Sequence, residues 1–268
     1  WKDHVCDCFP LVGVLDTPWR WINADAEAMG QWLLAVRGLL MRGDPIDLRT
    51  APPAINWIEL DGSRDHSRQL AAARVRSLSD NGSVIVIGDS TNPESQRRVA
   101  SQTPGAIAVE AVDLKDLVSF ARAFNPEASD ALGLLSRFAQ SVMTNVGAGE
   151  LVRRVESLER GAARIPPSVI EKAALAFVQS PSHSTAVDFL EDVSRERGVR
   201  TYRPAVLRAC IRALQLAAGA NGMTLYDASI RMREQHRMQG RLLPRRAVGS
   251  TLLLKGLEAE VAVILNAD

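Results

Sequence analysis

Several features that define common classes of protein are scarce or absent in this sequence. Only three of its 268 residues are cysteine (Cys6, Cys8 and Cys210), an odd number that does not suit the disulfide framework of a small secreted domain. No apolar run is long enough to cross a membrane, and no charged segment followed by an apolar one opens the chain. The few cysteines favour a reducing compartment, and the lack of a long apolar run argues against a membrane-spanning protein. We therefore expect a cytoplasmic protein.

The common phosphate-binding signature of nucleotide hydrolases is also absent. The chain contains no G-x-x-x-x-G-K-[ST] loop, and its nearest stretch, "IGDSTNPES", has one glycine and no lysine. Asp89 in that stretch lacks the second acidic neighbour that would help it to hold magnesium. The chain by itself therefore does not carry a complete site for the hydrolysis of a nucleoside triphosphate.

Two other kinds of site find little support in the spacing of residues. Cys6 and Cys8, with His4 nearby, begin a metal-binding pattern, but no second ligand pair follows at the spacing of a zinc site. An α/β enzyme could use "DST" or "HST" residues as a nucleophilic set, yet Ser184 after His183 lacks the G-x-S-x-G context. Both remain alternatives that the spacing does not favour.

The charge of the chain is distributed unevenly. A composition that is 46% hydrophobic allows a well-buried core and two domains of unequal size. The formal net charge is only +1, but the segment from Arg195 to Arg246 holds twelve arginines, no lysine and three acidic residues, an excess of nine positive charges. Such a block suits a phosphate backbone, because each neutralised phosphate releases a counterion. The alternative is a solvated helical face whose acidic partners lie elsewhere in space.

Strand and helix patterns alternate in the first part of the chain. The continuous apolar run "SVIVIGD" is typical of a buried parallel strand, and Gly43 marks the end of a strongly periodic helix. Strands that alternate with helices predict a parallel sheet with helices on both faces. The predicted strands cover 11–17, 54–60, 83–89 and 106–112, and the predicted helices cover 23–43, 65–78 and 114–124.

The middle of the chain has almost no strand signal. Residues 125–243 form short helical patterns separated by glycine and proline, which predicts an all-α insert. Strand character returns at "EVAVILNAD" near the end of the chain. We therefore expect a discontinuous α/β domain made of 1–124 and 244–268, interrupted by the helical insert, with its last strand joining the first sheet.

Three stretches resemble motifs of the UvrD/Rep-type superfamily 1 DNA helicases. "STLLLKGLEAEVAVI" (250–264) resembles motif V, since Lys-Gly-Leu-Glu stands directly before an apolar strand. "LDTPWRWIN" (15–23) stands where these helicases carry motif IV, and "VIVIGDSTNPESQRRV" (84–99) resembles their strand and loop that ends in Thr-Asn. The resemblance covers the whole chain in order. It implies a RecA-like second domain (2A), of P-loop NTPase-like fold, with a helical 2B-like insert.

For ATP, the resemblance implies a site shared between two domains. Trp19 corresponds to the aromatic residue that stacks on adenine, and Arg20 to the catalytic arginine that reaches the γ-phosphate. Gly256 would let the backbone approach the nucleotide closely, and Glu258 would accept a hydrogen bond from the ribose. The cofactor is ATP with Mg²⁺, whose ligands are expected in a missing N-terminal RecA-like domain.

For DNA, the resemblance implies a track along the second domain. Thr91, Asn92, Ser250 and Thr251 would line single-stranded or forked DNA. In the insert, Arg208 and Arg212 would touch the nucleic-acid backbone. The implied partners are DNA and the missing RecA-like domain, and a nuclease or repair partner is left open.

The sequence departs from the helicase pattern at the DNA side. Leu252 stands where motif V has histidine, and Asp89-Ser90 replaces the usual Tyr-Arg before Thr-Asn. We expect an excised piece of a longer helicase, running from just after motif III to just after motif V, that does not hydrolyse ATP alone. The alternative is a degenerate helicase-like module that binds nucleic acid or protein without an ATP cycle.

Some of these residues also have a purely structural interpretation. Trp19 and Trp21 could be core aromatics on either side of an arginine that pairs with a surface carboxylate. Glu258 could be an exposed glutamate after a tight turn.

Overall fold

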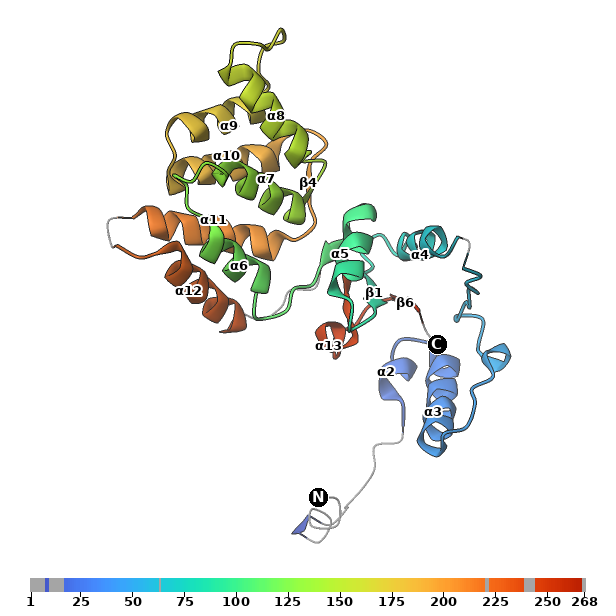
Figure 1. Ribbon diagram of the computed structural model, residues 1–268. Coiled ribbons are helices and arrows are strands. Elements are labelled where there is room, and N and C mark those ends of the chain that lie inside the picture. Colours follow the sequence, from blue (N-terminus) through green and yellow to red (C-terminus); the bar gives the residue numbers. More distant parts are fainter. Residues whose placement is uncertain (1–7, 10–16, 63, 220–221, 239–243, 267–268) are drawn as a thin grey trace. The chain divides into compact units, whose positions relative to one another are not determined.

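A computed structural model of the chain describes residues 8–9, 17–62, 64–219, 222–238 and 244–266. The chain divides into two compact units, which we call the N-terminal unit (Trp1–Asp65) and the C-terminal unit (His66–Asp268). Figure 1 shows the helices and strands of both. Each unit is described by itself below.

Residues 17–62 of the N-terminal unit form two helices and a short 3-10 turn. They are α2 (Trp19–Ile22), α3 (Glu27–Arg42) and η1 (Leu48–Thr50). Gly43 ends α3 with a φ of 73°, so the predicted glycine stop is confirmed. Gly30 allows α2 to approach α3, because a Cβ atom there would lie 2.7 Å from the Cβ of Trp21. The strand predicted over 11–17 lies outside the described residues except for Thr17.

The strand predicted over 54–60 is wrong. This segment forms no regular structure, and the amide of Ile55 bonds to the carbonyl of Pro52 in a turn. The side chains of Trp57 and Ile58 are 54% and 48% exposed. Alternating apolar residues produced the strand pattern, but a strand also needs a neighbouring strand that pairs with its backbone, and no described strand does so here.

The C-terminal unit is built on a four-stranded parallel sheet. Its strands are β1 (Val84–Gly88), β2 (Ile107–Ala108), β5 (Arg246–Ser250) and β6 (Val261–Ile264), in the spatial order β2-β5-β1-β6. The buried strand predicted over 83–89 is confirmed, and so is the return of the last strand to the first sheet. We did not predict β5, which lies between β1 and β2 and carries an arginine and a glycine.

Helices pack on both faces of this sheet. On one face, Val86 and Val248 pack against residues of α5 (Pro93–Gln102) and against Ala73, the last residue of α4 (Asp65–Ala73). On the other face, Ile85 and Ala247 pack against α13 (Thr251–Leu254). α4 stops well before the end predicted at residue 78, because the Arg246 side chain bonds the carbonyl oxygens of Ala73 and Val75.

The described residues between β2 and β5 form seven helices, which we call the helical body. They are α6 (Lys115–Ala123), α7 (Ala131–Val142), α8 (Ala148–Glu159), α9 (Val169–Gln179), α10 (His183–Arg195), α11 (Pro204–Ala218) and α12 (Leu225–Met238). Two short strands, β3 (Met143–Thr144) and β4 (Arg200–Thr201), pair antiparallel within this segment. The segment is therefore mainly helical and not purely so.

The helical body has its own hydrophobic core. Phe120 of α6 stacks with Phe124 and with Phe138 of α7, with ring centroids 4.8 Å and 4.4 Å apart. α6 also packs against α11 and α12. The core of the helical body therefore begins near Leu114, before the predicted boundary at residue 124, because the buried face of α6 belongs to the helices and not to the sheet.

Candidate functional site

The ends of two neighbouring parallel strands place several predicted residues at one edge of the sheet. Gly88, the last residue of β1, pairs with Ser250, the last residue of β5. Ligands of open parallel sheets bind outside the carboxyl ends of the strands. Thr91 and Asn92, which follow β1, therefore lie at the same end of the sheet as Ser250 and Thr251. We call this end of the sheet, where the carboxyl ends of the strands lie, the carboxyl edge.

The loop after β1 is held by its own polar side chains. The Asp89 carboxylate accepts hydrogen bonds from the Thr91 amide (2.8 Å) and the Thr91 hydroxyl (2.7 Å). These bonds hold the pKa of Asp89 below its usual value. Asn92 caps α5, since its side-chain oxygen accepts a hydrogen bond from the Ser95 amide at 3.0 Å. Thr91 and Asn92 are both exposed despite these bonds.

The segment after β5 turns its side chains in two directions. Ser250 is only 7% exposed, and its hydroxyl accepts a hydrogen bond from the Leu253 amide at 3.4 Å as the cap of α13. Thr251 is exposed, and the Leu252 side chain is 78% exposed. Of the two predicted hydroxyls, only that of Thr251 is therefore open to solvent at the carboxyl edge.

Gly256 lies in a conformation that favours glycine. Its φ is 81°, and no atom lies within 4 Å of a Cβ built there. The turn is closed by a hydrogen bond from the Leu257 amide to the Leu254 carbonyl at 3.1 Å. Glu258 follows at an exposed position. The Lys-Gly-Leu-Glu segment therefore makes a tight turn between α13 and β6.

Trp19 and Arg20 open the helix α2 in the N-terminal unit. Trp19 is 64% exposed and Arg20 is exposed, whereas Trp21 is half-buried against Gly30. The alternative that Trp19 is a core aromatic is therefore wrong, while Trp21 does have a packing role. The strand predicted over 11–17 would place Trp19 and Arg20 just after the end of a strand, but they lie on a helix, where successive side chains are about 100° apart.

The predicted ATP residues thus belong to two different units. Trp19 and Arg20 are in the N-terminal unit, and Gly256 and Glu258 are in the C-terminal unit.

Part of the arginine block serves the fold. Arg200 donates three hydrogen bonds of 2.7–2.9 Å to backbone carbonyls at the end of α5 and before β2. Arg246 likewise bonds two backbone carbonyls after α4. These charges face the interior, so the excess of nine positive charges in the sequence overstates what the surface offers to a ligand.

Arg203 lies at the centre of a buried ionic cluster. Its guanidinium is 2% exposed and donates two hydrogen bonds to the Glu110 carboxylate, at 2.6 Å and 2.8 Å. It also bonds Asp116 at 2.6 Å, and Arg97 bonds the same carboxylate at 2.9 Å. Burial by itself lowers the pKa of Arg203, but the bonds to Glu110 and the negative charges of Glu110 and Asp116 outweigh it and raise this pKa.

Arg208 and Arg212 are the arginines of α11 that face solvent. They are four residues apart, so they share one face of the helix, and both are exposed. Within the described parts of the chain, neither forms an ion pair, and Arg212 donates only to Gln215, at 3.4 Å. This face is one part of the arginine block that is open to an external anion, and Arg197 and Arg231 of the block are exposed as well.

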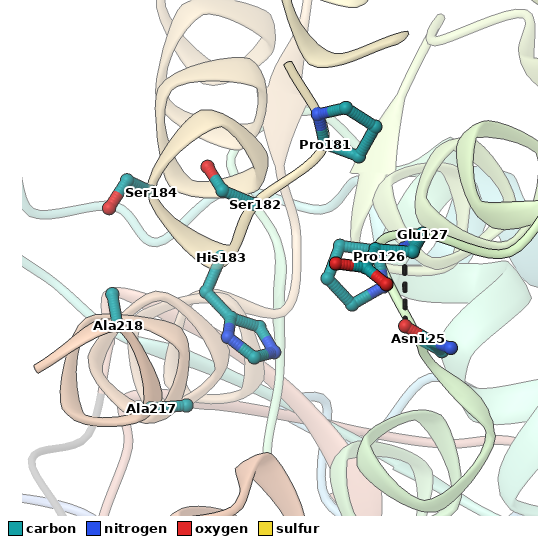
Figure 2. A pocket seen from close by; sticks show the side chains of 9 residues that line it. All are labelled: Asn125, Pro126, Glu127, Pro181, Ser182, His183, Ser184, Ala217 and Ala218. Carbon is teal, nitrogen blue, oxygen red and sulfur yellow. Dashed lines mark hydrogen bonds between the residues drawn. The ribbon is translucent and has the colours of Figure 1, made fainter. Parts of the chain in front are cut away.

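A pocket of about 500 Å³ surrounds His183 at the start of α10 (Figure 2). Burial lowers the pKa of His183. The Ser184 side chain points away from the imidazole ring, and the Ser182 hydroxyl accepts the Thr185 amide at 3.1 Å as a helix cap. No hydrogen bond joins His183 to a hydroxyl group in the described structure, so the nucleophilic "HST" alternative lacks the geometry that it needs.

The described residues also bear on a metal site and on a membrane helix. Among the described residues, no three potential ligands come together as a metal site. Cys8 is exposed, while His4 and Cys6 lie outside the described residues. None of the described helices is long and apolar enough to cross a membrane.

The fold and the carboxyl edge define the class of this protein. It is an α/β protein whose four-stranded parallel sheet ends in exposed hydroxyl, amide and apolar side chains beside an arginine-bearing helical body. Comparisons with models of known protein families, with curated proteins and with solved structures found no match.

Proposed function

We propose that this chain is part of an ATP-dependent DNA helicase or translocase, namely a RecA-like second domain with a helical 2B-like insert. One observation carries the proposal. Two segments that resemble helicase motifs, 84–99 and 250–264, meet at one edge of a parallel sheet through the pairing of Gly88 with Ser250. They are far apart in the sequence, and a chance resemblance gives no reason for them to meet where such sheets bind ligands.

The carboxyl edge supplies the DNA side of this proposal. The hydroxyl of Thr251 and the amide of Asn92 offer hydrogen bonds to phosphate or sugar oxygens. Leu252 offers an apolar surface for a base or sugar where helicases carry a histidine. Arg208 and Arg212 contribute charge, and their exposed, unpaired state leaves them able to neutralise phosphates.

On the ATP side, the proposal gives each predicted residue a separate role. An exposed indole such as Trp19 can stack on a purine, and stacking of this kind is worth ~1–3 kcal/mol. Arg20 offers planar donors to the γ-phosphate, whose developing charge is the main quantity that such enzymes stabilise. Gly256 leaves room for backbone approach and Glu258 accepts from the ribose. A partner domain supplies the phosphate loop and Mg²⁺, so this chain alone hydrolyses no ATP.

A second candidate function is a helicase-like binding module without an ATP cycle. Asp89 and Ser90 favour it, because they replace the Tyr-Arg of the helicase pattern at the carboxyl edge, so that an exposed carboxylate is present and the arginine is lost. A negative charge there repels the phosphates of a strand that moves along the edge. The module would then bind a protein, or DNA through the helical body alone.

The test is a fluorescence-polarisation titration of a labelled single-stranded oligonucleotide over a salt series. We expect the logarithm of the binding constant to fall linearly with the logarithm of salt concentration. The Arg208→Ala/Arg212→Ala pair should reduce the magnitude of this slope by about 0.7 for each lost phosphate contact on a single strand. The control pair, Arg153→Ala/Arg160→Ala, removes two exposed charges from α8 and its C-cap and should leave the slope unchanged.

Two results would contradict the proposal. Absence of binding at low salt would remove the nucleic-acid function. DNA-stimulated turnover of ATP by the chain alone would show that the chain holds all the catalytic residues. It would contradict an ATP site that a partner domain has to complete.

A further inference from the structure

The helix that carries the exposed arginines is anchored at its first residue. Arg203 is the N-cap residue of α11, and Pro204 occupies the first helical position. The Arg203 side chain is almost fully buried, which is rare for arginine and occurs where the charge is paired. The start of α11 is therefore held by a side chain as well as by the backbone.

The partner of this anchor belongs to the sheet. Glu110 follows β2, and β2 is a parallel neighbour of β5. Glu110 therefore lies at the same carboxyl edge as Ser250, and it accepts two hydrogen bonds from the Arg203 guanidinium. Asp116, in the first turn of α6, accepts a third. One side chain thus joins the carboxyl edge to two helices of the helical body.

Backbone bonds reinforce the same junction. The Ala108 amide of β2 donates to the Tyr202 carbonyl at 2.8 Å, and the Arg203 amide donates to the Val142 carbonyl at 3.2 Å. The Tyr202 hydroxyl donates to the Ser141 carbonyl at 2.7 Å. The residues just before α11 are therefore bonded to the sheet on one side and to the end of α7 on the other.

Arg208 and Arg212 lie about 8 Å and about 14 Å along the axis of α11 from this anchor. We propose that Arg203 is a positioning residue that holds this arginine face in register with the carboxyl edge, so that one strand of nucleic acid contacts both at once. The inference rests on the proposed DNA-binding function, and it adds that the sheet and the helical body present a single surface. A planar guanidinium is required, because the three donors that bridge Glu110 and Asp116 are not available to a lysine ammonium in the same geometry.

The experiment compares how much the Arg208→Ala/Arg212→Ala pair reduces the salt slope with and without a change at Arg203. In the wild-type background, Arg208→Ala/Arg212→Ala is expected to reduce the salt slope by about 1.4, or about 0.7 for each arginine. In the Arg203→Lys background, we expect the same pair to reduce it by less than half as much. Asp116→Asn, a milder change at a part-exposed carboxylate, should act in the same direction. Circular dichroism and thermal unfolding check that each variant is folded.

Arg154→Lys is the matched control. Arg154 also pairs with a carboxylate, Glu171, at 3.1 Å, but it does so between α8 and α9, within the helical body. In this background the arginine pair should keep its full effect on the slope. A full effect in the Arg203→Lys background as well would overturn the inference, since the loss of Arg203 would then leave the arginine face in place.

A second measurement separates this inference from the proposed function. Spin labels at Thr91→Cys and Arg212→Cys, with Cys6 and Cys8 replaced by serine, report the distance between the carboxyl edge and α11 without DNA. We expect one narrow distance distribution that broadens or shifts in Arg203→Lys. An unchanged distribution would overturn the positioning role whatever the DNA result, whereas a broadened one without any DNA binding would contradict only the proposed function.

Discussion

Asn92 is a residue at which the role in the fold and the proposed DNA contact can be tested separately. Its side-chain oxygen caps α5, and its exposed side chain also lies at the carboxyl edge. Aspartate caps a helix about as well as asparagine does. Asn92→Asp should therefore keep the free energy of unfolding within about 0.5 kcal/mol of the wild type while weakening DNA binding, because the added charge repels phosphate. Urea unfolding and the polarisation titration measure the two effects.

Asn92→Ala provides the complementary variant. It removes the cap and should lower the free energy of unfolding by about 1 kcal/mol. If Asn92→Asp binds DNA as tightly as the wild type at low salt, the carboxyl edge does not lie along the phosphate backbone.

Gly256 is a second position where a single residue decides the local backbone. An alanine at a φ of 81° is strained, and Gly256→Ala should cost about 1–2 kcal/mol of unfolding free energy. Gly149→Ala is the control, since Gly149 is in α8, has an ordinary φ and has open space around its Cβ position. That change should stabilise by up to about 1 kcal/mol. Denaturant unfolding would refute the argument if both variants shifted in the same direction.

At the scale of elements, the Arg203 cluster joins a strand end to two helices. Arg203→Met leaves the buried Glu110 carboxylate without its main partner and should lower the free energy of unfolding by about 3–5 kcal/mol. Adding Glu110→Gln removes the uncompensated charge, so the double variant should be more stable than Arg203→Met alone. Urea unfolding of the two single variants and the double variant measures the coupling. Equal stability of Arg203→Met and the wild type would contradict the proposed contribution of this cluster to the free energy of unfolding.

At the scale of the whole molecule, one half-buried histidine predicts how stability depends on pH. Burial lowers the pKa of His183 below that of the unfolded chain. The unfolded state therefore binds a proton more readily, so the contribution of this group to stability is present above the unfolded pKa and is lost as pH falls below it. His183→Gln should make the fall in stability between pH 7.5 and 5.5 shallower. Ser184→Ala, in the same pocket, is the control and should keep the wild-type slope, as thermal unfolding at each pH would show.

Local patterns predicted much of the fold and only part of the candidate site. The apolar run of β1 and the glycine stop of α3 were recognisable because each signal lies within a few residues. β5 was missed because Arg246 and Gly249 weaken its strand pattern, and its neighbours β1 and β2 provide the pairing. Trp57 and Ile58 alternate as in a strand but have no described strand beside them. The exposure of Trp19 and the burial of Ser250 and Arg203 likewise depended on tertiary packing.

The sequence by itself determined which segments become helices and strands around β1, α3 and α6, since backbone preference and apolar period act over short distances. It also determined the excess of arginine before the last strands. Only the tertiary structure decided that Gly88 lies beside Ser250 and that Arg203 is buried while Arg208 is exposed. Strand neighbours and buried ion pairs join residues that are distant in the chain, so their energies depend on the whole arrangement and not on any local pattern.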